Sequence, residues 1–124
     1  MTRPGAVLAA CLLPACLAAP GLRAQVINEI MYHPREEIAP GTEDKRFEWI
    51  EIYNPDPDPV DLSGYRLGGV AFTFLAGEFL RGRSYLVVCA DEASVQSKYD
   101  LGAEVTVGNW IDSALDNSGE RITL

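Results

Sequence analysis

Cysteine and histidine are scarce in this sequence, and their scarcity excludes several kinds of site. Of the three cysteines, Cys11 and Cys16 lie in an apolar stretch near the N-terminus, which leaves Cys89 alone in residues 25–124. A single cysteine cannot form an internal disulfide. The only histidine, His33, is accompanied by no cysteine cluster, so no zinc site is expected. Cys89 stands in an apolar run and is interpreted as a small core residue.

Positive charge is the second property that the sequence has little of. It contains 10 lysine and arginine residues against 18 aspartate and glutamate residues, a net charge of −8. Without Arg3 and Arg23, which both precede Gln25, the net charge is near −10. Proteins that bind nucleic acid carry a basic surface. The composition therefore argues against nucleic acid and anionic membranes as partners and predicts a solvated acidic surface.

A membrane-spanning run is also missing, although one shorter apolar segment is present. Residues 6–19 are apolar or small, and they are fewer than the ~20 residues that cross a bilayer as a helix. Arg3 precedes this segment as in a signal peptide, and Pro14 and Pro20 argue against a buried helix. We expect residues 1–24 to be the signal peptide of a secreted or cell-surface protein.

Two processing routes fit this leader. Cleavage between Ala24 and Gln25 places a small residue before the cut, as signal peptides require. In the alternative, Cys16 receives a lipid and anchors the protein at a membrane surface. We expect ordinary secretion, with lipidation at Cys16 as the second route.

Sustained helical periodicity is absent as well. Short apolar runs separated by glycine, proline, asparagine and aspartate predict an all-β fold. One short helix is expected over residues 92–99, with Asp91 at its N-cap. The strand over 84–89 is the most apolar and is expected to be central. The predicted strands cover residues 26–32, 47–53, 65–67, 70–75, 84–89, 104–107 and 120–124.

Three polar segments are predicted to connect these strands. Residues 35–46 are expected to be a loop centred on Pro40-Gly41. Residues 55–59 read Pro-Asp-Pro-Asp-Pro, and because each proline fixes its own φ this segment is expected to be a stiff loop tip. Residues 116–119 read Asp-Asn-Ser-Gly, a strong turn sequence.

Alternation in the second predicted strand indicates which side chains face the core. Ile50 and Ile52 fall on one face, while Trp49, Glu51 and Tyr53 fall on the other. We expect the two isoleucines inside. The aromatic residues on the opposite face are either covered by a loop or available to a partner.

The densest group of carboxylates is Asp56, Asp58 and Asp61. Calcium takes six to eight oxygen ligands, which makes this group a weak candidate calcium site. The glycine and terminal glutamate of an EF-hand are missing, and prolines stiffen the segment. A rigid, solvated loop tip is the expected outcome.

A second set of carboxylates, Glu29, Glu48 and Glu51, resembles in type the acid pair of a glycosidase. All three lie in or beside predicted strands. We therefore expect them to be surface residues with cross-strand partners such as Arg46 or Arg66.

Motifs for other chemistries are missing. No serine lies in a Gly-x-Ser-x-Gly sequence that would pair it with His33, and no glycine group forms a phosphate-binding loop. Trp49, Tyr53 and Trp110 are conceivable contacts for a glycan or protein, although core positions are the stronger expectation. No catalytic residue and no cofactor are expected.

Five short motifs in a fixed order resemble the lamin-tail domain of bacterial secreted proteins. They lie at residues 26–34 (VINEIMYHP), 48–54 (EWIEIYN), 61–65 (DLSGY), 85–88 (YLVV) and 115–120 (LDNSGE). The resemblance implies an immunoglobulin-like β-sandwich over residues 25–124, with one short helix and with its last strand missing after Leu124.

The resemblance also implies a non-catalytic extracellular module that binds a protein or cell-surface partner. Two alternatives stay open. One is an accessory domain of a larger secreted enzyme, kinase-like, nuclease or phosphoesterase, whose catalytic part lies beyond Leu124. The other is a calcium-dependent adhesion or carbohydrate-binding module.

Overall fold

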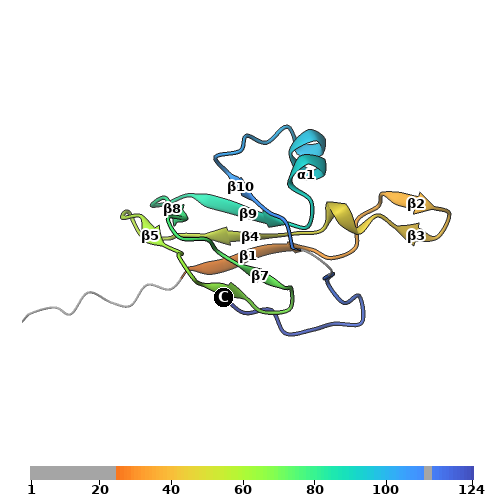
Figure 1. Ribbon diagram of the computed structural model, residues 1–124, viewed down its shortest axis with the longest axis horizontal. Helices are drawn as coiled ribbons and strands as arrows, with labels where there is room; N and C mark the ends of the chain where they lie inside the picture. The colour runs from red at the N-terminus through yellow and green to blue at the C-terminus, as the bar shows by residue number, and fades with distance from the viewer. Residues whose placement is uncertain (1–24, 111–112) are drawn as a thin grey trace, which may run out of the picture.

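The computed structural model describes residues 25–110 and 113–124, and Figure 1 shows their arrangement. The predicted leader, with Cys16 and Ala24, lies outside the described residues. The described part of the chain is mostly β-strand with one short α-helix. None of its helices is long and apolar enough to cross a membrane.

A sheet of four strands forms one layer of the domain. Its strands run in the order β1 (Val26–Met31), β4 (Trp49–Tyr53), β9 (Tyr85–Cys89) and β10 (Thr106–Val107). The β1–β4 and β4–β9 pairs are antiparallel, and the β9–β10 pair is parallel. The apolar β9 lies inside the sheet, which confirms the prediction that it is central.

Short antiparallel pairs face this sheet. They are β5 (Val60–Asp61) with β8 (Phe79–Leu80), and β6 (Arg66–Leu67) with β7 (Phe72–Thr73). Figure 1 shows β5 and β8 at one end of the four-stranded sheet and a separate hairpin, β2–β3, projecting from the other end.

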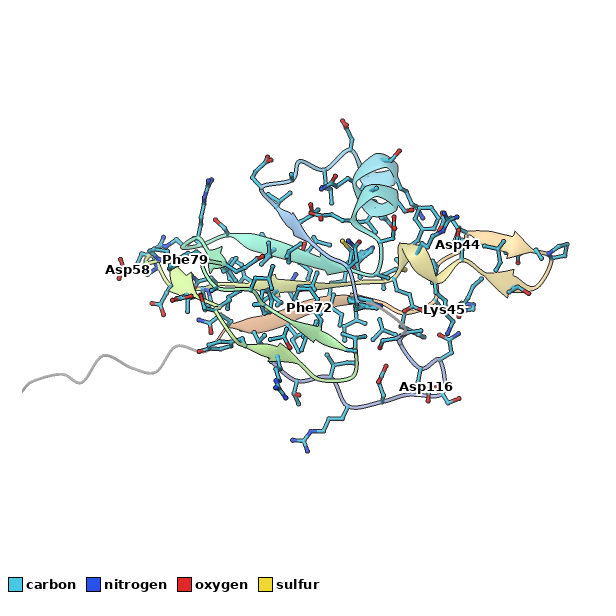
Figure 2. The ribbon with its side chains drawn as sticks, viewed as in Figure 1. Asp44, Lys45, Asp58, Phe72, Phe79 and Asp116 are labelled. Carbon is cyan, nitrogen blue, oxygen red and sulfur yellow. The ribbon has the colours of Figure 1, made fainter. Side chains whose placement is uncertain are left out.

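Apolar side chains from the two layers meet in one core. Ile50 and Ile52 of β4 are completely buried there, as predicted, and burying such a side chain contributes about 1.5–3 kcal/mol. The ring of Phe72, near the middle of the molecule in Figure 2, packs edge-on against Phe74 at 5.0 Å between centroids. The other core residues are Leu62, Leu67, Val70, Leu80, Leu86, Val88, Trp110 and Leu115. This two-layer core confirms the predicted sandwich.

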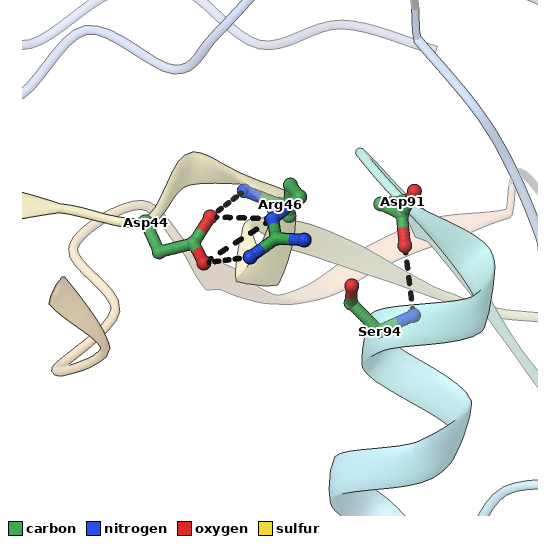
Figure 3. Close-up of polar contacts among 4 residues, drawn as sticks. All are labelled: Asp44, Arg46, Asp91 and Ser94. Carbon is green, nitrogen blue, oxygen red and sulfur yellow. Dashed lines mark hydrogen bonds and ion pairs between the residues drawn. The ribbon is translucent and has the colours of Figure 1, made fainter. Parts of the chain in front are cut away.

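The helix α1 (Glu92–Tyr99) covers part of the outer face of the four-stranded sheet. Trp49 and Cys89 are buried there with Val95 of the helix. Trp49 therefore lies on the face opposite the isoleucines, as predicted, and the helix shields it. Asp91 caps the helix as predicted, because its Oδ1 accepts a hydrogen bond from Ser94 N at 2.8 Å (Figure 3).

The prediction of a plain loop over residues 35–46 is wrong. Gly41 has a φ of +78°, a conformation that suits glycine, and it closes a hairpin there. Asp44 then caps a turn of 3-10 helix, accepting from Arg46 N at 3.2 Å and from Arg46 Nη2 at 2.6 Å (Figure 3). The Arg46 guanidinium holds the pKa of Asp44 below its usual value. The elements in this segment are β2 (Glu37–Ala39), β3 (Thr42–Glu43) and η1 (Lys45–Phe47).

Several predicted strands are also wrong in extent. The strand expected over 104–107 is limited to β10, and the strand expected over 47–53 begins only at Trp49. The strand expected over 70–75 is reduced to β7, since Phe72 N donates to Val70 O at 2.9 Å in a tight turn that interrupts it. The strand expected over 120–124 is a single β-bridge between Thr123 and Gly68. Thr123 comes so close that a Cβ at Gly68 would lie 2.4 Å from its Oγ1.

The proline-rich tip at residues 55–59 is held by the buried side chain of Asn54 and by a backbone hydrogen bond from Arg83 N to Asp56 O at 2.8 Å. Asn54, which is fully buried, donates from Nδ2 to Asp58 O at 2.9 Å and accepts from Asp56 N at 3.0 Å. Gly82 packs against the tip so closely that a Cβ there would lie 1.9 Å from Pro57 O. The expected stiff tip is therefore fastened to the end of β8.

Candidate functional site

A groove separates β1 from the C-terminal segment of the domain. It encloses about 350 Å³, and the turn that begins at Asp116, labelled in Figure 2, forms its polar rim. Its apolar lining comes from Ile30, Tyr32, Leu115 and Ile122. Ile30 is 37% exposed and Tyr32 is 51% exposed, whereas Leu115 is buried at the floor. Accessible apolar surface of this kind is typical of binding sites.

β1 is the edge strand beside this groove. It pairs with β4 along one side, and no other strand of the described residues pairs with it. None of the backbone hydrogen bonds found outside the strand pairs of the described chain involves residues 26–31. The outer edge of β1 thus presents unpaired backbone groups, which template the addition of another strand.

The turn at the rim is well ordered by its own hydrogen bonds. Gly119 N donates to Asp116 O at 2.9 Å, and Ser118 N donates to the Asp116 side chain at 2.8 Å. Glu120 accepts from Asp116 N at 2.8 Å. The predicted turn over residues 116–119 is therefore confirmed, and it gives the groove a fixed acidic rim.

A buried carboxylate lies behind the groove. Glu48 is fully buried, and its Oε2 accepts a hydrogen bond from Leu115 N at 2.8 Å. Its Oε1 has no hydrogen-bond partner among the described residues. Burial raises the pKa of Glu48, and the Leu115 N–H opposes that rise only in part. Glu48 thus fastens the C-terminal segment to the sheet through Leu115.

His33 lies near the same end of β1 and touches the C-terminal turn. Its Nδ1 is 2.6 Å from Glu43 Oε2, an ion pair when the ring is protonated. Asn117 Nδ2 donates to Glu43 Oε1 at 2.7 Å. These contacts join the β2–β3 hairpin to the turn, and they place His33 in a loop, as expected.

The three glutamates considered as a glycosidase pair do not converge. Glu29 and Glu51 are opposite each other in the β1–β4 register, on the outer face of the sheet, whereas Glu48 is buried against Leu115. The prediction that Arg46 or Arg66 is a cross-strand partner of these glutamates is wrong. Arg46 pairs with Asp44, Arg66 lies in β6 opposite Thr73, and Glu51 accepts from Asn28 Nδ2 at 2.7 Å.

The three aspartates considered for calcium lie around the proline-rich tip. Asp61 is occupied by Ser63, whose backbone N donates to its Oδ1 at 2.8 Å. Asp56 donates a hydrogen bond from its backbone N to the Asn54 side chain, and the backbone O of Asp58 accepts one from it. Across residues 25–110 and 113–124, no group of three or more histidine, cysteine, aspartate or glutamate side chains could hold a metal ion.

Cys89 and the conspicuous aromatic residues serve mainly in packing. Burial raises the pKa of the Cys89 thiol to about 12, so it stays protonated at neutral pH. Trp110 is buried in the core, as expected. Tyr53 stacks on Tyr85 at 4.6 Å between ring centroids, and Tyr85 is about half exposed on the outer face.

Inspection of the sequence did not identify the groove, because its two sides lie far apart along the chain. Ile30 comes from the first strand, and Leu115 and Ile122 come from the C-terminal segment. A partial signal exists in the alternation of β1, which puts Ile30 on the inner face with Ile50. Nothing in that alternation shows that the opposite layer stops short of Ile30.

Comparison with known proteins gives one informative result. No curated protein and no solved structure matches this chain. A family model described as Lamin Tail Domain matches residues 23–124, a range that contains every described strand and the helix. The mostly-β sandwich with one short helix agrees with the immunoglobulin-like fold that this match implies. The chain belongs to the Lamin Tail Domain family.

Proposed function

We propose that this chain is a non-catalytic structural or interaction module of the lamin tail type, carried by an exported protein. The observation that supports the proposal best is the separation of its carboxylates. Glu48 is buried behind Leu115, while Glu29 and Glu51 lie on the outer face of the sheet. An acid–base pair needs two such groups facing one substrate.

The remaining surface features favour binding. The groove at Ile30 and Tyr32 is open and apolar, and the edge of β1 beside it has free backbone groups. Binding modules commonly combine an apolar anchor region with a polar rim. The groove and strand edge are therefore the proposed interaction surface.

The proposal of export rests on the N-terminal sequence. Residues 1–24 have the charge, apolar core and small residue before the cut that a signal peptide needs. Intact-mass measurement of the protein recovered from a bacterial host separates the two routes. A mature chain beginning at Gln25 is expected, whereas a lipid-bearing chain beginning at Cys16 would identify an anchored lipoprotein.

Enzyme assays test the non-catalytic part of the proposal. The purified protein is incubated with chromogenic glycosides, phosphomonoesters, phosphodiesters and casein, beside the Glu48→Gln and Glu51→Gln variants. We expect no turnover above buffer in any of the three proteins. Turnover by the parent that either variant loses would reveal an active site and overturn the proposal.

A further inference from the structure

We propose that the outer edge of β1 and the adjoining groove bind an extended polypeptide segment in which apolar and basic residues alternate. The segment would add to the sheet as a strand next to β1. This inference rests on the proposed function and names the class of partner for that surface.

The backbone of β1 supplies the first part of the argument. The strand spans Val26–Met31, and within the described chain its only strand partner is β4. Strand addition satisfies the exposed backbone groups of such an edge, and those hydrogen bonds do not depend on the partner's sequence. Selectivity must therefore come from the two faces of the sheet.

The inner face selects apolar side chains. Ile30 is opposite Ile50 in the register and so faces the core side, yet it is 37% exposed because the groove opens beside it. Leu115 and Ile122 line the other side of this groove. Every second side chain of a strand added to β1 would point into this apolar space.

The outer face selects positive charge. Glu29 and Glu51 are directly opposite each other on β1 and β4, an arrangement of like charges that destabilises a sheet. Asn28 donates one hydrogen bond to Glu51, and no ion pair found in the described residues involves either glutamate. Glu29 is exposed next to the free edge. A lysine or arginine on the outer face of the added strand would therefore lie beside Glu29.

Charge argues against a second copy of this chain as the occupant. The chain has a net charge of −8, and two copies paired through β1 would bring a second Glu29 to the same edge. Alternation of apolar and basic residues satisfies both faces at once. A basic, extended segment of another polypeptide is the better fit.

Fluorescence anisotropy with a labelled probe tests the proposal on the purified protein. The probe is an end-capped octapeptide in which valine and lysine alternate. One control peptide has the same composition with the four lysines grouped together. A second carries N-methyl groups on all of its amides, which removes the donors that strand pairing needs on either edge. Binding is measured at low and at physiological salt.

Two variants of the protein, each with a matched control, locate the contact. Glu29→Lys reverses the charge beside the edge, and Glu104→Lys makes the same change at an exposed position near β10, at the far side of the sheet. Ile30→Thr keeps a β-branched residue but removes apolar surface from the groove. Its control, Leu75→Thr, removes apolar surface at a position outside the groove, where the side chain is 73% exposed.

We expect the alternating peptide to bind, and both control peptides to bind at least tenfold more weakly. Glu29→Lys and Ile30→Thr should each weaken binding at least fivefold, and the two matched variants should not change it. Equal binding of the grouped-lysine peptide would show general charge attraction and overturn the inference. Absence of binding, with a stable dimer in sedimentation velocity, would instead assign the edge to a second copy. These failures leave the non-catalytic proposal intact, since only the enzyme assays address it.

Discussion

At the scale of single residues, the position of each glutamate relative to the sheet decides whether its carboxylate is buried or reaches the solvent. Glu48 directly precedes β4 and lies fully buried behind the groove, while Glu51 within β4 lies on the outer face with Glu29. The alternation of β4 predicted the buried isoleucines correctly. It did not predict the burial of Glu48, because a charged residue beside a strand is ordinarily expected at the surface.

Glu48 gives a prediction about pH. Burial raises its pKa in the folded protein above the ordinary 4.5, so the folded state holds the proton more tightly than the unfolded chain. Stability from this group therefore falls as pH rises between the unfolded and folded pKa values, and it stays reduced above them. Glu48→Gln removes the buried charge and should raise the melting temperature at neutral pH, with the gain vanishing below about pH 4.

Thermal melts across that pH range check the prediction. Glu104→Gln, at an exposed position, is the matched control and should leave the melting temperature nearly unchanged. A Glu48→Gln variant that melts lower than the parent at neutral pH would mean that the ionised carboxylate stabilises the C-terminal segment.

At the scale of elements, end-capping and close packing stabilise segments that are too short to be stable alone. The Asp91 side chain accepts from Ser94 N and begins α1, a helix of only eight residues. Isolated helices this short are unstable in water. The cap and the packing of the helix residue Val95 against Trp49 and Cys89 of the sheet must therefore stabilise α1.

Removal of this cap should loosen α1. Asp91→Ala is expected to lower the free energy of unfolding by about 1 kcal/mol, while Asp91→Asn, which also caps helices, should lose much less. Urea denaturation followed by tryptophan fluorescence measures both, since Trp49 lies under the helix. Equal losses in the two variants would point to the charge of Asp91, and not to its hydrogen bond, as the stabilising factor.

The contact between Gly82 and the proline-rich tip leads to a second prediction at this scale. A Cβ at Gly82 would lie 1.9 Å from Pro57 O, so Gly82→Ala must displace the tip or the end of β8. We expect a loss of about 1–3 kcal/mol in the free energy of unfolding.

Gly102→Ala is the matched control, because the nearest atoms to its added Cβ belong to the movable end of the Glu104 side chain. This variant should stay within about 0.5 kcal/mol of the parent. Similar losses at the two positions would indicate that the tip adapts and that the close contact at Pro57 is unimportant.

The length of an element explains why some elements could be predicted from the sequence and others could not. β4 and β9 have five residues each, long enough to show an apolar pattern, and α1 has a recognisable cap. β2 and β3 have only three and two residues, too few to show an alternation of apolar and polar side chains. Their pairing follows from the turn at Gly41 and from contacts made by the folded chain.

At the scale of the whole molecule, the sandwich itself was predictable and the groove was not. Alternating apolar residues and ordered motifs identify two facing layers of strands, whatever the lengths of the individual strands. The groove instead depends on how far the C-terminal segment reaches across β1. That distance is set by the Glu48–Leu115 hydrogen bond and the Gly68–Thr123 bridge, both formed between residues far apart in the sequence.

The proposed interaction requires that the outer edge of β1 is open for a partner. Residue-resolved hydrogen–deuterium exchange of backbone amides, measured by NMR on the purified protein, tests it most directly. We expect protection throughout β4, which is paired along its whole length on both sides, and protection of only alternate amides in β1, with the intervening ones exchanging nearly as fast as in an unfolded chain. Protection of every amide in β1 would show that its outer edge is already covered, and it would overturn the proposal that a partner strand binds there.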